Sequence, residues 1–187
     1  MGSSAISPSW ASALGDSPFA IRAATANDLP AILRLIRALA QYERLEHLCV
    51  ATEADIARGL FGEPQRAEVL LASHADEVIA FALFFHNFST FLGRPGIWLE
   101  DLFVLPEHRR RGCGKALLRR LAALARERDC GRFEWAVLDW NADAIGFYES
   151  LGAAILPDWR IVRVTGPALH VLANLPDGAA PAPPDRG

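Results

Sequence analysis

The feature that most constrains the fold is a strand, a loop and a helix that follow one another directly along the chain. Ile97 to Val104 is predicted as a strand. Lys115 to Arg128 carries apolar residues at helical spacing with arginines on the opposite side, which is typical of an amphipathic helix lying on a sheet. The loop between them contains three arginines and two glycines. Alternation of this kind predicts a mixed α/β fold.

Capping patterns and β-prone runs predict the remaining elements. Thr25 with Asp28, and Thr52 with Asp55, have the spacing of capping boxes that begin helices. Asn141 can cap a later helix. The predicted helices cover 29–40, Thr52 to Gly59 or Gly62, 115–128 and 141–152, and the predicted strands cover 68–73, 78–86, 97–104, 133–139, 159–164 and 168–172.

Length and composition predict one domain. A chain of 187 residues, 51% of them apolar, is long enough to bury one substantial core. We predict that residues 19–172 form this domain, with one mixed, mostly antiparallel sheet and helices on both of its faces. Residues 1–18 and the Pro/Ala/Gly-rich residues 173–187 are predicted to be flexible, because they lack apolar periodicity.

The loop at 105–114 has the composition of an anion site. Gly112 and Gly114 let a backbone approach an anion closely, and N–H groups in the first turn of the following helix point towards it. The loop is followed by no Gly-Lys-Ser/Thr, and a third glycine is missing, so it is neither a Walker loop nor a clear Rossmann fingerprint. The alternatives are an ordinary turn or an arginine run that is simply a solvated surface.

Charge and cysteine content narrow the class of protein. Nineteen basic against 22 acidic residues give a net charge of −3, which supplies no field for holding nucleic acid. Lys115 is the only lysine, so an arginine is weak evidence for any particular site. The three cysteines lack metal-ligand spacing, and no apolar run approaches the length of a membrane span. We therefore expect a cytoplasmic protein without a metal, a nucleic acid partner or a membrane association.

Several motifs together resemble the GNAT (GCN5-related) N-acetyltransferases. The coenzyme A motif of that superfamily matches Arg109-x-x-Gly112-x-Gly114 after Leu102-Phe103-Val104. The resemblance is to the spermidine/spermine (diamine) and thialysine acetyltransferase branch, it covers residues 19–172, and it implies a twisted sheet that is split near its fourth strand. The further matching motifs, in chain order, are Ile21-Arg22-Ala-Ala-Thr25, Ala40-Gln-Tyr-Glu43, Leu99-Glu-Asp-Leu-Phe-Val104, Trp140-Asn141 and Phe147-Tyr148.

The resemblance implies acetyl-CoA as co-substrate and no metal. Pantetheine would pair with the backbone of the strand that ends at Val104, and the pyrophosphate would lie on the glycine-containing loop. Asn141 is implied as a coenzyme contact, although the role of helix cap is simpler. The implied coenzyme-binding residues are Leu102, Phe103, Val104, Arg109, Arg110, Arg111, Gly112, Cys113, Gly114, Lys115 and Asn141.

Tyr148 and Glu100 are the candidate catalytic residues. By resemblance, the Tyr148 hydroxyl protonates the departing thiolate. An alkylammonium with a pKa of about 10.4 must lose a proton before it attacks, so a base is needed. Glu100 and Asp101 are adjacent in a strand, and alternation predicts that one faces the cleft and the other the opposite side. The resemblance selects Glu100 for the cleft; without it, both are equally well explained as solvent-facing charges.

The acceptor pocket is less well defined by the sequence. By resemblance, Tyr42 and Glu43 line it together with Glu100. His47 stands where a second acid would favour a long polyamine, so a diamine or a lysine-like amino acid is as plausible as spermidine. The alternatives are acetylation of a protein lysine or N-terminal amine, and a non-catalytic acetyl-CoA-binding module. The family is commonly dimeric, so we expect a homodimer.

Overall fold

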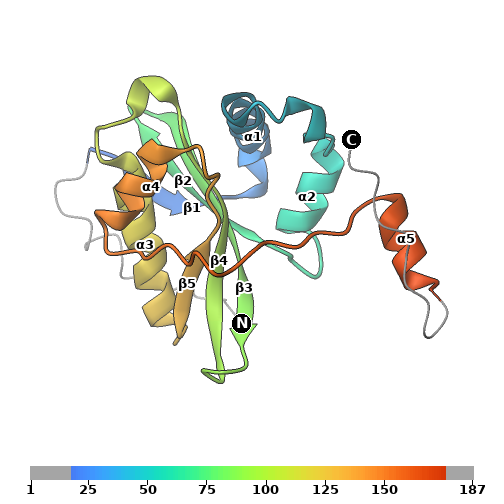
Figure 1. The fold of residues 1–187 in the computed structure, drawn as a ribbon. Helices are drawn as coiled ribbons and strands as arrows, with labels where there is room; N and C mark the ends of the chain where they lie inside the picture. The colour runs from blue at the N-terminus through green and yellow to red at the C-terminus, as the bar shows by residue number, and fades with distance from the viewer. Residues whose placement is uncertain (1–17, 176–187) are drawn as a thin grey trace, which may run out of the picture. The chain divides into compact units, whose positions relative to one another are not determined.

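A computed structural model describes residues 18–175 of the chain, in two compact units that divide between residues 136 and 137. The first unit holds a five-stranded sheet with the strands in chain order (Figure 1). The first four strands run antiparallel to their neighbours, and the fifth is parallel to the fourth. The predicted α/β fold with a mixed, mostly antiparallel sheet is thus confirmed. Its strands are β1 (Ala20–Ala23), β2 (Glu68–His74), β3 (Glu77–Ser89), β4 (Arg94–Val104) and β5 (Arg132–Trp135).

The strands predicted at 68–73 and 78–86 pair as a hairpin with a tight turn. His74 pairs with Glu77, so only Ala75 and Asp76 form the turn. Both turn residues have positive φ angles, of 48° and 67°, which is the geometry that suits the right-handed twist of two-residue hairpins. β1 was not predicted, and it has only four residues.

The two capping boxes begin helices as predicted. Asp28 accepts a hydrogen bond from the Thr25 N–H at 2.8 Å, ahead of α1 (Leu29–Glu43). At the start of α2 (Glu53–Phe61), the Asp55 N–H donates to Thr52 Oγ1 at 3.2 Å. Each box gives partners to backbone groups that the helix itself leaves unpaired.

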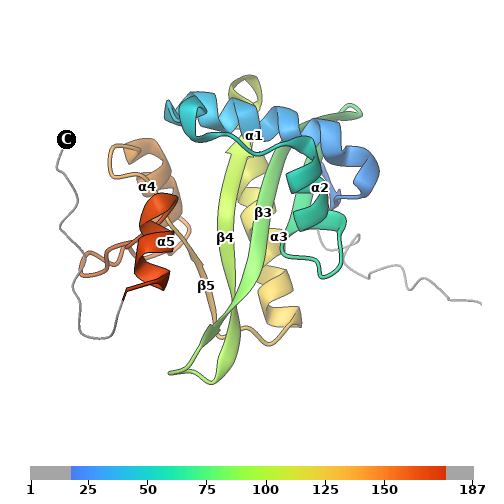
Figure 2. The same cartoon turned by 90° about the vertical axis from the view of Figure 1, so that its right-hand side faces the viewer.

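Helices cover both faces of the sheet in the first unit, as predicted. α1 and α2 lie over one face, and α3 (Cys113–Glu127) lies over the other (Figure 2). The apolar side of α3 is buried as its spacing indicates, with Leu117 and Leu121 fully enclosed. Arg120 differs from the predicted solvent-facing arginines: it is only 7% exposed and forms a 3.0 Å ion pair with Glu127.

The second unit contains α4 (Ala142–Glu149) and α5 (Pro167–Ala173). The prediction of strands at 159–164 and 168–172 is wrong. Residues 159–165 form no regular element and expose their β-prone side chains, because strand propensity produces a strand only where a sheet edge accepts it. Residues 168–172 are helical instead, with Pro167 at the first helical position, where its missing N–H costs nothing. β5 also ends at Trp135, four residues before the predicted end.

The ends of the chain lie largely outside the described residues. Our prediction of flexible segments at 1–18 and 173–187 therefore falls almost wholly on residues that the structure does not describe. Between residues 18 and 175, no helix combines the length and the apolar character that crossing a bilayer demands.

Candidate functional site

The sheet opens along one edge of β4. The parallel pairing of β4 with β5 covers only Gly96 to Leu99, which pair with Arg132 to Trp135. On its other side, β4 remains paired with β3 as far as Val104. Residues 100–104 of β4 therefore present their backbone without a pairing strand on the side of β5. An extended amide-containing chain can add to such an edge by main-chain hydrogen bonds.

The loop after β4 presents backbone N–H groups at the start of α3. Gly112 caps the helix in a left-handed conformation with φ of 88°, and Arg110 is also left-handed with φ of 60°. The first helical hydrogen bond runs from the Ala116 N–H to the Gly112 carbonyl, so the N–H groups of residues 113–115 have no acceptor within the helix. The helix begins two residues earlier than predicted. Arg110, Arg111 and Lys115 are exposed beside these groups, and the whole arrangement suits a pyrophosphate.

Cys113 contributes its backbone to this loop and hides its side chain. The residue is 2% exposed, and burial raises the pKa of its thiol to about 11. A thiol with that pKa is protonated at neutral pH and is a poor nucleophile. The loop therefore presents the backbone of Cys113 and not its thiol.

Arg109 turns away from the loop and back towards β4. Its Nε donates a hydrogen bond of 2.9 Å to the Val104 carbonyl. Its guanidinium carbon lies 4.2 Å from the centroid of the Tyr42 ring and 5.3 Å from that of Phe103. The two rings are themselves 6.4 Å apart and tilted by 53°. Arg109 thus connects the end of α1 to the end of β4.

A β-bulge corrects our prediction for Glu100 and Asp101. Leu83 pairs with Asp101 and Phe84 with Leu99, which leaves Glu100 as the additional residue of β4. A bulge breaks the alternation of side chains between the two faces of a sheet. The prediction that Glu100 and Asp101 point to opposite faces is therefore wrong.

Cross-strand partners show which face the two acids share. Arg128, the C-cap residue of α3, lies 5.9 Å from the Phe84 ring, so Phe84 is on the face that α3 covers. The neighbouring pair of Leu83 with Asp101 is therefore on the opposite face, towards α1. Trp98 lies on this same α1 face, and its Nε1 donates to Glu100 Oε2 at 2.9 Å. Both acids therefore lie on the face that α1 covers.

Glu43, at the end of α1, completes a group of three carboxyls with Glu100 and Asp101. The pKa of Asp101 is raised to about 7, firstly by burial and then by the negative charges of Glu100 and Glu43. Burial also raises the pKa of Glu43. Mutual repulsion of this kind is relieved when a cation is bound or a proton is taken up.

Tyr148 and Asn141 belong to the second unit. Asn141 is the N-cap of α4, as predicted, and its Oδ1 accepts from the Ala144 N–H at 3.3 Å. Tyr148 lies in the last turn of this helix, partly buried, with its ring 5.4 Å from that of Phe147. The helix ends ahead of Gly152, whose φ of 89° is left-handed. The structure describes Tyr148 within its own unit only, so its approach to Glu100 stays a prediction.

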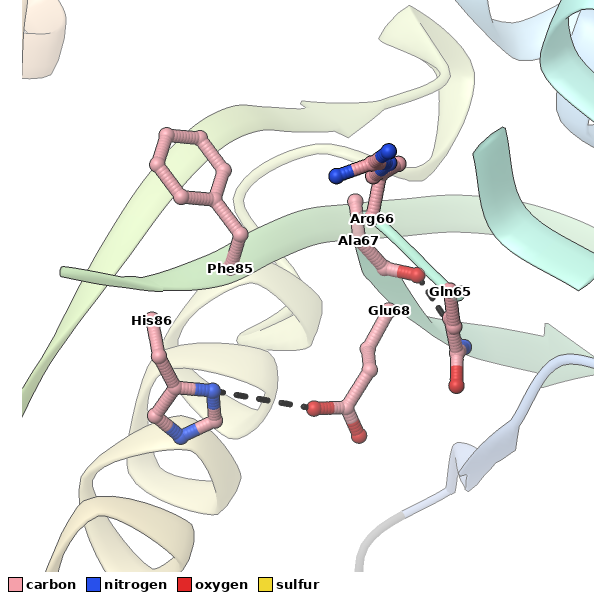
Figure 3. Close-up of a pocket in the computed structure, with 6 residues that line it drawn as sticks. All are labelled: Gln65, Arg66, Ala67, Glu68, Phe85 and His86. Carbon is pink, nitrogen blue, oxygen red and sulfur yellow. Dashed lines mark hydrogen bonds and ion pairs between the residues drawn. The ribbon is translucent and has the colours of Figure 1, made fainter. Parts of the chain in front are cut away.

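A pocket of about 240 Å³ lies elsewhere on the first unit, between the segment before β2 and the second half of β3 (Figure 3). Its carboxylate, Glu68, is already held by the guanidinium of Arg128, at 2.7 Å between Oε2 and NH2, and His86 Nδ1 lies 4.0 Å from Oε1. None of the predicted site residues lines this pocket. Within residues 18–175, no group of three His, Cys, Asp or Glu side chains has the arrangement of a metal site.

Comparisons with known proteins give this geometry a chemical class. The model of the acetyltransferase (GNAT) family matches residues 31–153. L-ornithine N5-acetyltransferase from Arabidopsis thaliana is 36% identical over 83% of this chain and 88% of its own. Thialysine N-epsilon-acetyltransferase from Bos taurus is 37% identical over 82% of this chain and 96% of its own. An integron cassette protein from the mobile metagenome of V. cholerae superposes with a TM-score of 0.73, at 27% identity over 86% of this chain and all of its own.

An open β4 edge followed by a glycine-capped helix, together with these relatives, defines an acetyl-CoA-dependent N-acetyltransferase. The chain belongs to the GNAT acetyltransferase family, and it resembles the diamine and thialysine branch as the sequence motifs indicated. It is thus an enzyme that transfers an acetyl group to an amine, and the non-catalytic alternative is set aside.

Proposed function

We propose that this enzyme acetylates a primary amine of a small cationic molecule, such as a diamine, a polyamine or a lysine-like amino acid. The observation that carries the proposal is the group of three carboxyls, Glu43, Glu100 and Asp101, on the face of β4 beside its open edge. Negative charges concentrated in a partly buried site attract a molecule with more than one positive charge. The names of the relatives support this class, since ornithine and thialysine both present a side-chain amine.

We infer direct attack of the amine in a ternary complex. Acetyl-CoA supplies a thioester; the amine nitrogen forms a bond to its carbonyl carbon, and the carbon–sulfur bond breaks. Removing the ammonium proton costs roughly 4–5 kcal/mol at pH 7. We assign this proton to Glu100, directly or through a water, with Asp101 as the alternative acceptor because its pKa of about 7 is close to the ideal for a base at neutral pH. The Tyr148 hydroxyl then gives its proton to the thiolate, and the second proton lost by the nitrogen as it becomes an amide returns to the tyrosinate.

The same proposal assigns the coenzyme contacts. Main-chain groups of Leu102, Phe103 and Val104 suit the amides of pantetheine, since this part of β4 lacks a pairing strand on one side. The N–H groups of residues 113–115 and the charges of Arg110 and Arg111 suit the pyrophosphate. We keep Asn141, and the backbone of Arg109, as further contacts on the strength of the resemblance.

Release of free thiol from acetyl-CoA tests the acceptor class. The panel contains short diamines, ornithine, lysine, thialysine, spermidine, an aminoglycoside, a monoamine without a second charge and a lysine-containing peptide. We expect the highest kcat/KM with a small molecule that carries a second charge near the reacting amine. A higher kcat/KM with the peptide would establish protein acetylation instead, and equal values for amines with and without a second charge would refute the role of the carboxyls.

Glu43→Gln tests whether a carboxyl holds the distal ammonium. A carboxylate next to the reacting nitrogen would raise the pKa of that amine, so the proposal places Glu43 beside the second charge. We expect the variant to raise KM for a diamine by about ten-fold, corresponding to one charge-assisted contact, with a smaller change in kcat. Glu53→Gln, in the exposed first turn of α2, is the matched control. An equal loss for a monoamine without a second charge would contradict the assignment.

Tyr148→Phe tests the proton donor. A thiol with a pKa of about 8.5 is already a fair leaving group, whereas a phenol near 10 is a ready donor. We therefore expect a slower enzyme, by about 100-fold in kcat, with KM for acetyl-CoA little changed. An unchanged kcat would remove Tyr148 from the mechanism.

We also propose a homodimer. The support is the apolar surface between α4 and α5, where Trp159, Ile161 and Val162 are 75%, 66% and 88% exposed. Exposed apolar side chains this close together favour an interface. Light scattering should give twice the 20.4 kDa of one chain, and Val162→Asp should give a monomer. A single-chain mass for the unmodified protein would refute the dimer.

A cytoplasmic location stays a prediction, supported by the free thiols of Cys49, Cys113 and Cys130.

A further inference from the structure

Arg109 is the first residue of the coenzyme motif, yet its side chain is engaged elsewhere. The guanidinium lies over the Tyr42 ring at 4.2 Å and near the Phe103 ring at 5.3 Å, while Nε donates to the Val104 carbonyl at 2.9 Å. Two aromatic rings and one carbonyl therefore hold the guanidinium from several directions. The side chain is partly buried in this position, unlike those of Arg110 and Arg111, which are exposed.

The groups that Arg109 touches belong to different parts of the proposed site. Tyr42 is the last but one residue of α1 and directly precedes Glu43. Arg44 then ends the helix in a left-handed conformation, with φ of 61°. The Tyr42 ring, 6.4 Å from that of Phe103, therefore ties the end of α1 to β4 directly beside Glu43. Val104, in contrast, lies at the end of β4, where the coenzyme loop begins.

We propose that Arg109 is a positioning residue that couples the coenzyme loop to the acceptor pocket. Resting on the proposed function, this inference assigns Arg109 to the placement of Tyr42 and Glu43 relative to β4, and leaves the phosphates to the backbone N–H groups. A displacement of the loop moves the guanidinium, and with it the end of α1. The affinity for the amine thus depends on a residue of the coenzyme motif that does not touch the amine.

The geometry requires arginine rather than any cation. A guanidinium is planar, so it stacks on a ring while its in-plane Nε–H reaches a carbonyl. A lysine ammonium is a compact point charge, which retains the positive charge but cannot make the stack and the Nε hydrogen bond together. Arg109→Lys therefore separates the charge of the residue from its shape. A stacked cation and a charge-assisted hydrogen bond together correspond to about a ten-fold change in affinity.

The decisive experiment is a double-mutant cycle with Arg109→Lys and Tyr42→Leu. Steady-state kinetics with the best amine of the panel should show about a ten-fold rise in KM for the amine in each single variant, with KM for acetyl-CoA changed less than two-fold. The double variant should be no worse than Tyr42→Leu alone, because the two residues act through one contact. Tyr42→Phe retains the aromatic face and should therefore raise KM for the amine less than Tyr42→Leu does. Arg119→Lys, exposed on α3, is the matched control.

Hydrogen exchange provides a second measurement that needs no substrate. Amides of residues 40–50 should exchange faster in Arg109→Lys than in the control, since the end of α1 loses its contact with β4. Unchanged exchange and additive effects in the cycle would overturn the proposal. A rise in KM for acetyl-CoA alone would do so as well, because it would identify Arg109 as a phosphate contact. If no amine is acetylated but exchange still accelerates, the proposed function fails and the positioning role stands.

Discussion

Asp101→Asn should make the protein more stable at alkaline pH while weakening the enzyme. In the folded chain the pKa of Asp101 is raised from 3.8 to about 7, with burial as the largest cause and the charges of Glu100 and Glu43 next. A folded carboxyl with a raised pKa holds a proton that the unfolded chain has already released. The free energy of unfolding therefore falls as pH rises from about 4 to about 7, and the full cost persists above that range.

The magnitude follows from the two pKa values. At about 1.4 kcal/mol per pKa unit, the difference between 3.8 and about 7 sets a ceiling of about 4 kcal/mol on the cost of the ionised carboxylate. Part of this cost is already present at pH 5, so the change in cost between about pH 5 and pH 8.5 has a ceiling of about 3 kcal/mol. Water that reaches the side chain reduces the change further. We therefore expect Asn to increase the free energy of unfolding by about 1–3 kcal/mol more at pH 8.5 than at pH 5.

Urea unfolding followed by tryptophan fluorescence, at both pH values, measures this difference. Asp129→Asn is the matched control, because Asp129 is 81% exposed and pairs with Arg94 only at the surface. Asp101→Asn should also raise KM for a diamine, since it removes one carboxyl from the group of three. A stability gain that is equal at the two pH values, or a loss at pH 8.5, would refute the burial of an ionisable group at this position.

Three further predictions concern the coenzyme loop and the helix behind it. Cys113 should react with iodoacetamide at least about ten-fold more slowly than Cys49 at pH 8, because its pKa is about 11 and it is 2% exposed; equal rates by mass spectrometry would contradict its burial. Leu117→Ala should lower the free energy of unfolding by about 2–5 kcal/mol in urea, since the side chain is fully enclosed, and a loss below 1 kcal/mol would argue against the packing of α3. Gly112→Ala should cost about 1–2 kcal/mol because its φ is 88°, and it should weaken acetyl-CoA binding in calorimetry; a fully stable variant with unchanged affinity would show that the loop tolerates another conformation.

Local signals in the sequence predicted the parts of the fold that depend on local physics. Capping boxes at Thr25 and Thr52 depend on residues three apart, and both helices begin where these boxes lie. The apolar face of α3 and the Asn141 cap are equally local. The strands predicted at 159–164 and 168–172 are wrong because a strand needs a partner. The β propensity of residues 159–164 says nothing about whether a sheet edge is available.

The site was predicted less completely, for a related reason. The bulge at Glu100 exists only in the register between β3 and β4, which no single strand reveals. Alternation within β4 therefore led to opposite orientations for Glu100 and Asp101. Arg109 was grouped with its neighbours because the three arginines look alike along the chain, whereas Tyr42, 67 positions earlier, determines where the guanidinium rests. An aromatic residue next to a predicted pocket acid was the available signal for that contact.

The lone lysine has a practical consequence. Lys115 is exposed in the first turn of α3, among the groups proposed to receive the pyrophosphate. Every side-chain amine reagent therefore has one target in this chain, and that target reports on the coenzyme site. Non-enzymatic acetylation of the protein by acetyl-CoA can modify one side-chain amine only, that of Lys115. Transfer to an added amine is therefore measured with little background from acetylation of the enzyme itself. The fraction of Lys115 that is protected from an amine-reactive label, measured by mass spectrometry, therefore reports the fraction of enzyme that has acetyl-CoA bound.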